Sequence, residues 1–364
     1  MLHTVAPDPQ RLALENPAKA AHFAALDVRL REGAGMDAEQ MRAWCHAGLE
    51  LGRAAEVGKV CQELLARPEV HAALRPYCLF FLSGALLQQF QVEAGVAVLR
   101  EALQALCVAP RVYNRRVRPD KFEDPRIEAL LWRTLAQLAQ GGVRAFAHAG
   151  TLLGLEREGR LLPFDKDLDL GLLVEDLPRA AAILLEHGWR RPALAFNIDN
   201  MSSWHHGEID VVLDLCGLAQ QSGSASGDLL GGFWIRQCRP IGQQRLTRFP
   251  GPVELERVAG PAGPVWRLKQ PLRWLEALYG PHWRTPDPSF DTIIGAHNLI
   301  GFSALTQWYA YSRICNAWVN GHWEKALRLA QLVLQRHTPD DPLLLAVAAT
   351  LQGSLAQLTP QQRG

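Results

Sequence analysis

Three aspartates at alternate positions carry the clearest chemical signal in the sequence. Asp165, Asp167 and Asp169 lie in the run Phe-Asp-Lys-Asp-Leu-Asp-Leu. In a strand, side chains two residues apart share a face, so these carboxylates would point the same way. Like charges this close repel unless a cation lies between them, and carboxylate oxygens suit Mg²⁺ or Mn²⁺. The spacing predicts a divalent-metal site, with a solvated acidic edge strand as the alternative.

A second acidic element follows in the run Gly-Glu-Ile-Asp-Val-Val-Leu-Asp-Leu, which we predict to be a strand over 207–215. Glu208, Asp210 and Asp214 share one face of that strand because all three are even-numbered. Asp210 has apolar neighbours on both sides, which favours a carboxylate held on a buried strand. Carboxylates from two neighbouring strands are what metal-dependent phosphoryl transfer uses, because metal ions stabilise both the attacking and the leaving oxygens.

A glycine-containing turn precedes the acidic run, in the sequence His-Ala-Gly-Thr-Leu-Leu-Gly. Gly150 allows a close backbone approach and Thr151 offers a hydroxyl group. Backbone N–H groups at the start of the following helix can bind a phosphate. Arg157 lies between this turn and the acidic strand, where it would neutralise a diphosphate; the alternative is a solvated arginine at a helix end.

The region that must position these residues runs from 111 to 290. It combines alternating apolar and polar residues with glycine and proline turns, which predicts a small mixed sheet decorated by helices. We expect strands at 143–150, 168–174 and 207–215, a turn running into a helix over 150–159, and helices at 125–140 and 177–187. The Gly/Ser-rich segment 220–232 reads as a loop that covers the site.

The flanks, 1–110 and 291–364, are rich in helix-forming residues with apolar side chains at helical spacing. Segments 52–68 and 321–339 can be aligned, and both resemble the helix-turn-helix unit of tetratricopeptide repeats. Ordinary antiparallel helical hairpins are the alternative. We therefore predict an α+β protein with a central catalytic domain, 111–290, between two all-α domains that offer a surface for a protein partner.

Charge and composition limit the partners. The 38 basic and 37 acidic side chains leave a net charge of +1, so no general field attracts nucleic acid or an anionic membrane. The basic run 112–121 has no stacking aromatic beyond Tyr113 and reads as a solvated linker. We expect no nucleic-acid partner.

Sequence features also bear on location. Seven cysteines without a Cys-x-x-Cys pair argue against a disulfide scaffold or a zinc ribbon. The first residues lack the pattern of a secretion signal, and no stretch is apolar enough for a transmembrane segment. We expect a cytoplasmic protein. The alternative is peripheral attachment to the inner face of a membrane.

Several ordered motifs resemble those of the LicD/fukutin-related family. The resemblance rests on a Gly-Thr-Leu-Leu-Gly turn, an arginine, a Pro-Phe-Asp-Lys-Asp-Leu-Asp strand, a later Ile-Asp-Val and a downstream Tyr-Gly-x-x-Trp-x-x-Pro element. These motifs lie at 150–154, Arg157, 163–169, 209–211 and 279–286. Phe164 stands where the family usually has tryptophan. Lys166 stands where an acidic or aromatic residue is common, and we expect it to contact the donor.

The resemblance implies a DNA polymerase β-like nucleotidyltransferase fold. It also implies a transferase that moves a phospho-alcohol group, such as phosphocholine or ribitol phosphate, from a CDP-linked donor to a glycan or glycolipid and releases CMP. By this analogy Asp167 and Asp169 are paired metal ligands and Asp165 an accessory ligand. Asp210 is the third carboxylate and the base for the acceptor hydroxyl, favoured by the family pattern over Glu208 and Asp214.

Four further residues are candidates for substrate contact: His148, His206, Tyr279 and Trp283. Each has a packing alternative, because aromatics at helical spacing are usually core residues. Adjacent histidines in a strand face opposite ways, so only one of His205 and His206 would serve. Two other functions use the same residues: a nucleotidyltransferase that consumes an NTP and releases pyrophosphate, and a non-catalytic helical-repeat protein with a degenerate transferase core.

Overall fold

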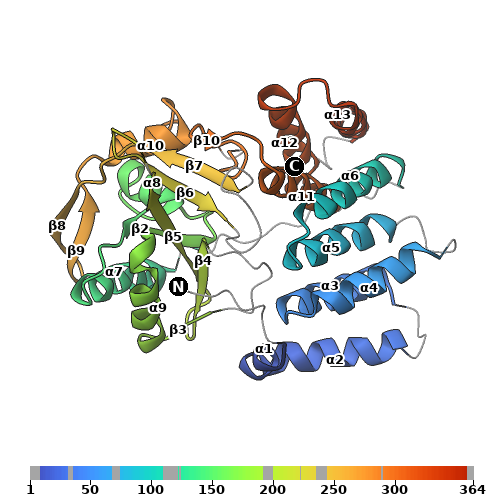
Figure 1. The fold of residues 1–364 in the computed structure, drawn as a ribbon, viewed down its shortest axis with the longest axis horizontal. Helices are drawn as coiled ribbons and strands as arrows, with labels where there is room; N and C mark the ends of the chain where they lie inside the picture. Colours follow the sequence, from blue (N-terminus) through green and yellow to red (C-terminus); the bar gives the residue numbers. More distant parts are fainter. Residues whose placement is uncertain are drawn as a thin grey trace.

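The protein has an α+β fold, as predicted, in which a sheet-containing unit lies beside a helical unit (Figure 1). The structure is a computed structural model. It describes residues 9–31, 36–67, 74–109, 122, 124–191, 200–221, 223–234, 244–287 and 290–358. The basic run 112–121 lies outside these residues. Within them, no helix is long and apolar enough to cross a membrane.

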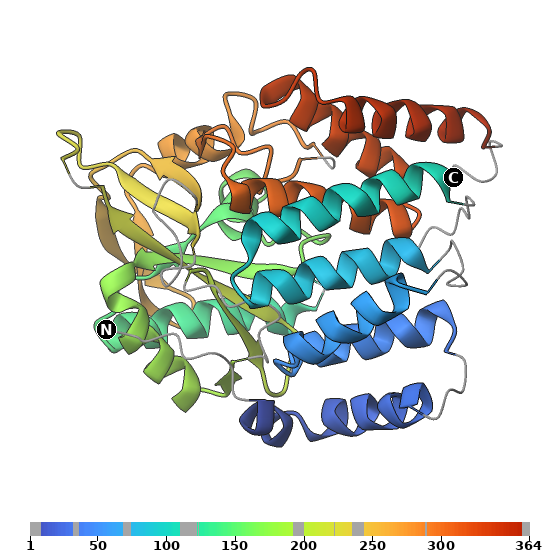
Figure 2. The same cartoon turned by 45° about the vertical axis from the view of Figure 1, so that its right-hand side comes forward.

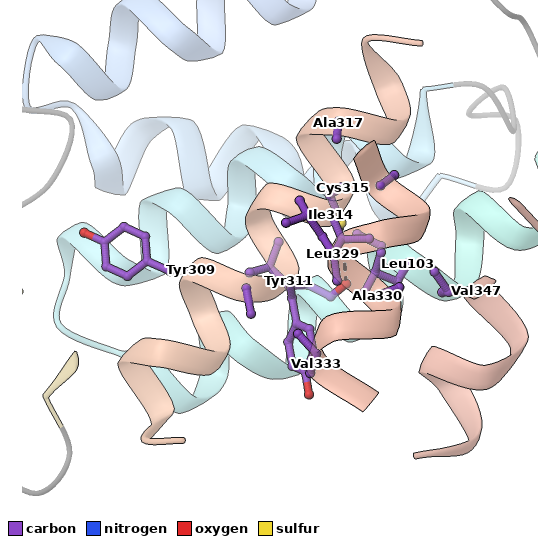
Figure 3. Close-up of a cluster of buried hydrophobic side chains, with 14 of the residues drawn as sticks. Leu103, Tyr309, Tyr311, Ile314, Cys315, Ala317, Leu329, Ala330, Val333 and Val347 are labelled. Carbon is purple, nitrogen blue, oxygen red and sulfur yellow. Dashed lines mark hydrogen bonds between the residues drawn. The ribbon is translucent and has the colours of Figure 1, made fainter. Parts of the chain in front are cut away.

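The first and last parts of the chain form one helical unit rather than two separate ones. Its helices are α1 (Pro9–Glu15), α2 (Pro17–Arg31), α3 (Ala38–Glu50), α4 (Ala54–Leu65), α5 (Arg75–Gln88), α6 (Val92–Val108), α11 (Ala304–Val319), α12 (Trp323–Arg336) and α13 (Pro342–Ala356). Leu103 of α6 is buried with Ile314, Leu329 and Val347 of the C-terminal helices (Figure 3). Figure 2 shows α6 lying against these helices. A single apolar core therefore joins the two flanks.

Three turns of the helical unit share one geometry. Gly52, Phe90 and Gly321 each follow the last residue of a helix by two positions and adopt φ of 71°, 61° and 76°. In each turn the next N–H donates to the carbonyl five residues earlier, as in Arg53 to Gly48 and His322 to Ala317. This is the Schellman pattern, which favours glycine because its φ is positive. The alignment of 52–68 with 321–339 thus corresponds to equivalent turns.

The main sheet has the order β1-β2-β5-β6-β7-β10, and β4 pairs with both β3 and β5. The strands are β1 (Phe146–Ala147), β2 (Asp167–Leu173), β3 (Trp189–Arg190), β4 (Ser202–His206), β5 (Val212–Gln220), β6 (Leu229–Phe233), β7 (Arg245–Phe249) and β10 (Leu299–Ile300). β2 and β5 run parallel, whereas the other pairs are antiparallel. A separate hairpin contains β8 (Leu255–Gly260) and β9 (Gly263–Leu268).

The two faces of the central strands have different roles. Leu168, Leu170 and Leu213 are buried with side chains of α7 (Pro125–Gln140) and α9 (Leu177–Glu186). The alternate residues of β2 and β5 face the other side, where α8 (Ala149–Arg157) and α10 (Pro271–Tyr279) pack through a second core. The acidic side chains of β2 lie on this second side.

Two expected boundaries differ from the observed elements. β10 pairs with Leu246 and Thr247 of β7, so the sheet extends past the expected domain end at residue 290. The segment expected to be a loop, 220–232, contains the start of β6, because Gly231 and Gly232 pair with Thr247 and Leu246. Glycines taken as loop signals are here strand residues, since pairing with β7 decides their conformation.

Candidate active site

An acidic cluster forms where β2 and β5 lie side by side. Asp169 is directly opposite Asp214 in the parallel register, and Asp165 precedes β2. Burial raises the pKa of Asp169 well above its usual value, and the charges of Asp167, Asp214 and Asp165 raise it further. Burial and the charge of Asp167 also raise the pKa of Asp165 and of Asp214 to about 7. The cluster is thus a concentration of negative charge that favours proton or cation binding.

The first turn of α8 holds Asp169 in place. The Gly150 N–H donates to Asp169 Oδ2 at 3.1 Å, and the Asp169 N–H donates to Thr151 Oγ1 at 2.8 Å. The His148 N–H donates to the Asp169 carbonyl at 2.9 Å. We expected Gly150 and Thr151 to bind a phosphate; the structure instead commits these groups to Asp169. The reason is that α8 begins at Ala149, so both residues belong to the helix and face β2.

Gly150 also leaves room for the carboxylates. A Cβ atom at this position would lie 2.3 Å from Asp165 Oδ2 and 3.4 Å from Asp169 Oδ2. The first distance is far inside van der Waals contact, so a larger residue would displace Asp165. The glycine is therefore required by the close approach of the acidic side chains.

Asp214, not Asp210, is the β5 acid that joins the cluster. Asp214 is only 4% exposed and accepts a hydrogen bond from Ser203 Oγ at 2.5 Å. Asp210 is exposed and lies before β5, which begins at Val212. The prediction for Asp210 assumed a strand from 207 to 215. Because strand alternation applies only inside the strand, Asp210 and Glu208 do not share the face of Asp214.

The prediction that His206 contacts the substrate is also corrected by the position of its strand. His206 contacts the Trp189 ring at 5.2 Å, and its Nδ1 accepts from the backbone N–H of Glu208 and Ile209. Strand β4 places His206 with buried Trp204 on the side of α7, away from the acids. Ser203 and His205 occupy the acidic side of the strand. His206 therefore stabilises a turn rather than contacting the cluster.

Tyr279 and Arg157 do lie near the acids. Burial raises the pKa of Tyr279 well above its usual value, the charges of Asp169 and Asp165 raise it further, and Arg157 opposes them. The Tyr279 ring lies 5.0 Å from that of Phe290. The Arg157 side chain is largely buried, and its Nε donates to Glu158 at 2.9 Å. The end of α10 and the end of α8 thus meet beside the cluster.

Of the other two aromatic candidates, one lies beside the cluster and one is a packing residue. His148 is buried, and its Nδ1 accepts from Trp274 Nε1 at 3.0 Å. Burial lowers its pKa to about 4, so the ring is neutral at neutral pH. Trp283 is buried in the core that joins α8 to α10, with the Arg284 guanidinium over its ring. The packing alternative therefore describes Trp283.

A recess of about 530 Å³, open to solvent, begins at the acidic cluster and extends along β5, β6 and β7. Asp169 and His148 lie at one end, and Phe233 and Arg245 contribute to its lining farther along. Arg245 was not anticipated, because nothing in the pattern Arg-Leu-Thr-Arg-Phe separates a buried arginine from an exposed one.

The helical unit contributes positive charge at the edge of the site. Lys325 of α12 has a lowered pKa, first because it is partly buried; Asp291 raises it, while the charges of Lys166 and Arg313 lower it further. Arg313 of α11 donates to Asp291 Oδ2 at 2.8 Å. Lys166 itself is exposed next to Asp165. Lys325 is therefore close enough to Lys166, the neighbour of Asp165, for their charges to interact.

The donor chemistry of the cluster fits a divalent cation. Asp167, Asp169 and Asp214 are oxygen donors of the type that Mg²⁺ and Mn²⁺ prefer, and their mutual repulsion favours a bound positive charge. Among the residues that the structure describes, no three His, Cys, Asp or Glu side chains already stand together in a metal-binding arrangement. The fit therefore rests on charge, donor type and the space beside Gly150.

A comparison with known families agrees with this placement. Residues 142–207 match the family model described as LicD/FKTN/FKRP, nucleotidyltransferase domain. The matched segment includes α8 and β2 but ends before β5, so the position of Asp214 rests on the geometry. A search of curated proteins found no match for the chain. Residues 142–207 are thus similar to the nucleotidyltransferase domain of the LicD/FKTN/FKRP family.

Proposed function

We propose that this protein is a metal-dependent phosphotransferase. It moves a phospho-alcohol group from a CDP-linked donor to a hydroxyl of a glycan or glycolipid and releases CMP. The observation that carries the proposal is the placement of Asp167, Asp169 and Asp214 on two neighbouring parallel strands beside the first turn of α8. The family match over 142–207 supports the same class of chemistry.

Asp167, Asp169 and Asp214 are the residues that would hold Mg²⁺ or Mn²⁺, and Asp165 lies beside them as an accessory acid. A bound divalent ion supplies charge neutralisation to the diphosphate and to the leaving CMP. The Gly150 N–H holds the Asp169 carboxylate and Thr151 Oγ1 holds the Asp169 backbone N–H, so this carboxylate needs little rearrangement. This preorganisation is the contribution of α8.

In the proposed reaction the acceptor oxygen forms a bond to the β-phosphorus of the donor. The bond from that phosphorus to the bridging oxygen breaks, and the bridging oxygen leaves with CMP. The acceptor proton passes to the carboxylate of Asp214, the acid that β5 contributes to the cluster. Arg157, Lys166 and Lys325 supply positive charge around the phosphates.

The test is CMP release by the purified full chain. The protein is incubated with Mg²⁺ and, separately, with CDP-ribitol, CDP-glycerol and CDP-choline, and CMP is measured by liquid chromatography and mass spectrometry. We expect CMP from at least one donor, lost when EDTA removes the metal. Pyrophosphate released from an NTP, with no CMP from any donor, would favour the nucleotidyltransferase. Failure to bind Mg²⁺–CDP in calorimetry, together with no product, would favour the non-catalytic protein.

A further inference from the structure

The recess beside the acidic cluster contains a buried cation. Arg245 of β7 is only 4% exposed. Its Nε donates to the Ile293 carbonyl at 3.1 Å, and its Nη2 donates to the Thr292 carbonyl at 2.5 Å. No residue in the described part of the chain accepts a hydrogen bond from Nη1. Because burial lowers its pKa only to about 10, the guanidinium stays charged at neutral pH.

Strand alternation presents a row of side chains to the recess. Arg245, Thr247 and Phe249 lie on one face of β7 and all line it. Gly231 of β6 widens the recess, since a Cβ there would lie 3.2 Å from Phe249 and 3.4 Å from Thr247 Oγ1. The recess thus offers a hydroxyl group and a guanidinium inside largely apolar walls.

Arg245 also covers one face of the Phe233 ring, which lines the recess. The Arg245 guanidinium lies 5.3 Å from the centroid of the Phe233 ring. Quaternary ammonium groups are bound by the faces of aromatic rings, and this face is already covered by a cation. The nearby carboxylate, Asp291, is paired with Arg313 and does not face a ligand alone. A second buried cation next to Arg245 would be repelled.

We infer that this recess binds a hydroxyl-rich group, a polyol or a sugar, and excludes a quaternary ammonium group. The inference rests on the proposed function, because Asp169 at the mouth of the recess belongs to the reacting site. Hydroxyl oxygens accept from Arg245 Nη1 and exchange hydrogen bonds with Thr247. The hydroxyl-rich group is either the alcohol of the donor or the sugar of the acceptor.

The test compares donors in the wild-type protein and in variants of β7. Arg245→Gln removes the charge and keeps a donor group. Arg248→Gln is the matched control, because Arg248 is exposed on the other face of the same strand. We expect wild type to release CMP from CDP-ribitol at least about tenfold faster than from CDP-choline. Choline lacks the hydroxyl groups that would accept a hydrogen bond from the charged Arg245, and the loss of one such bond corresponds to about this factor. Arg245→Gln should reduce that preference about tenfold, and Arg248→Gln should leave it unchanged.

A second variant covers the case in which Arg245→Gln fails to fold. Thr247→Val removes one hydroxyl at nearly constant volume, and it should weaken use of CDP-ribitol without affecting CDP-choline. If the recess holds the acceptor, hydrolysis of CDP-ribitol in water stays constant in both variants, while the KM of a sugar acceptor rises. The inference would be overturned, and the phosphotransferase left intact, if neither variant changed the preference for CDP-ribitol over CDP-choline and neither raised the KM of the sugar acceptor.

Binding separates this inference from the proposed function. If no CDP-linked donor yields CMP, the phosphotransferase assignment fails. Calorimetry with free ribitol 5-phosphate and phosphocholine then decides the inference. Tighter binding of ribitol 5-phosphate, weakened in Arg245→Gln or Thr247→Val, supports it. Phosphocholine binding as tightly as ribitol 5-phosphate contradicts it.

Discussion

The helical unit and the sheet unit follow different rules. In the helical unit, local signals agree with the fold except at Phe90, which has the positive φ that favours glycine: three hairpin turns repeat one Schellman pattern, and the core that joins α6 to α11, α12 and α13 is almost entirely apolar. In the sheet unit, local preferences are overridden. Like-charged acids lie together in partly or fully buried positions, Ala149 has φ of 37°, and Arg245 is buried.

This difference separates stability from function. Natural folds keep local and global preferences consistent, and departures concentrate where a site needs them. All three departures surround one place, the start of α8 and the recess beside it. Substitutions there should alter activity far more than stability, whereas substitutions in the helical turns should do the reverse.

The largest effect is expected at the acidic cluster. Asp214→Asn removes a charge from the cluster and should reduce CMP release by about a thousandfold or more, on the scale of losing an electrostatic group at a reacting centre. Stability at pH 8 should not fall, because a repelled buried charge is removed. Activity is followed by CMP release and stability by urea unfolding.

Asp210→Asn is the matched control for that variant. Asp210 is exposed and precedes β5. CMP release by the Asp210→Asn variant should therefore stay within about twofold of wild type, as for a surface substitution. If Asp210→Asn were inactive and Asp214→Asn active, the family-based assignment would be right and the geometric one wrong.

A smaller loss is expected when the space beside the acids is filled. Gly150→Ala places a methyl group against Asp165 Oδ2, and we expect activity to fall about a hundredfold because the cluster is displaced. Gly159→Ala is the control: its φ is 69° and no atom lies within 4 Å of the added Cβ. It should lower stability by about 1 kcal/mol and leave kcat unchanged. Equal activity of the two variants would contradict the conclusion that a side chain at position 150 displaces Asp165.

The pH dependence of stability should also distinguish the units. The pKa of His148 is about 4 in the folded protein and 6.5 in the unfolded chain, so the unfolded chain binds more protons between these values. The stability from neutral His148 is therefore complete above pH 6.5 and is lost as pH falls toward 4. Melting temperatures at pH 4.5–7.5 test this. The melting temperature of wild type should exceed that of His148→Asn by less at low pH than at neutral pH.

His187→Asn provides the control for the pH experiment, because His187 is exposed at the end of α9. The stability difference between this variant and wild type should not vary with pH in the same range. A wild-type advantage over His148→Asn that stays constant from pH 7.5 to 4.5 would mean that His148 is not held neutral by its surroundings.

The smallest effects are expected in the helical turns. Gly52→Ala and Gly321→Ala place a side chain at positive φ and should each lower the free energy of unfolding by about 1 kcal/mol. CMP release should remain at the wild-type rate, since no residue of either turn lines the recess beside the acidic cluster. A loss of activity without a loss of stability would show that the helical turns couple to the site.

Much of the site was predictable from short-range patterns. The alternation of Asp165, Asp167 and Asp169 predicted acids on one side of a strand, and Gly150 predicted a close approach, because both features depend on residues near in sequence. The helices of both flanks were predictable for the same reason, since spacing of apolar residues reports one helix at a time.

Contacts between distant segments settled the remainder. The parallel register of β2 and β5 brings Asp214 opposite Asp169 and leaves Asp210 outside, and no local pattern encodes that register. Arg245 faces the recess because β7 pairs with β6, and Lys325 lies near Lys166 and Asp291 because α12 packs on a core shared with α6. Local spacing specifies which residues share a face of one element; packing between elements specifies which faces meet.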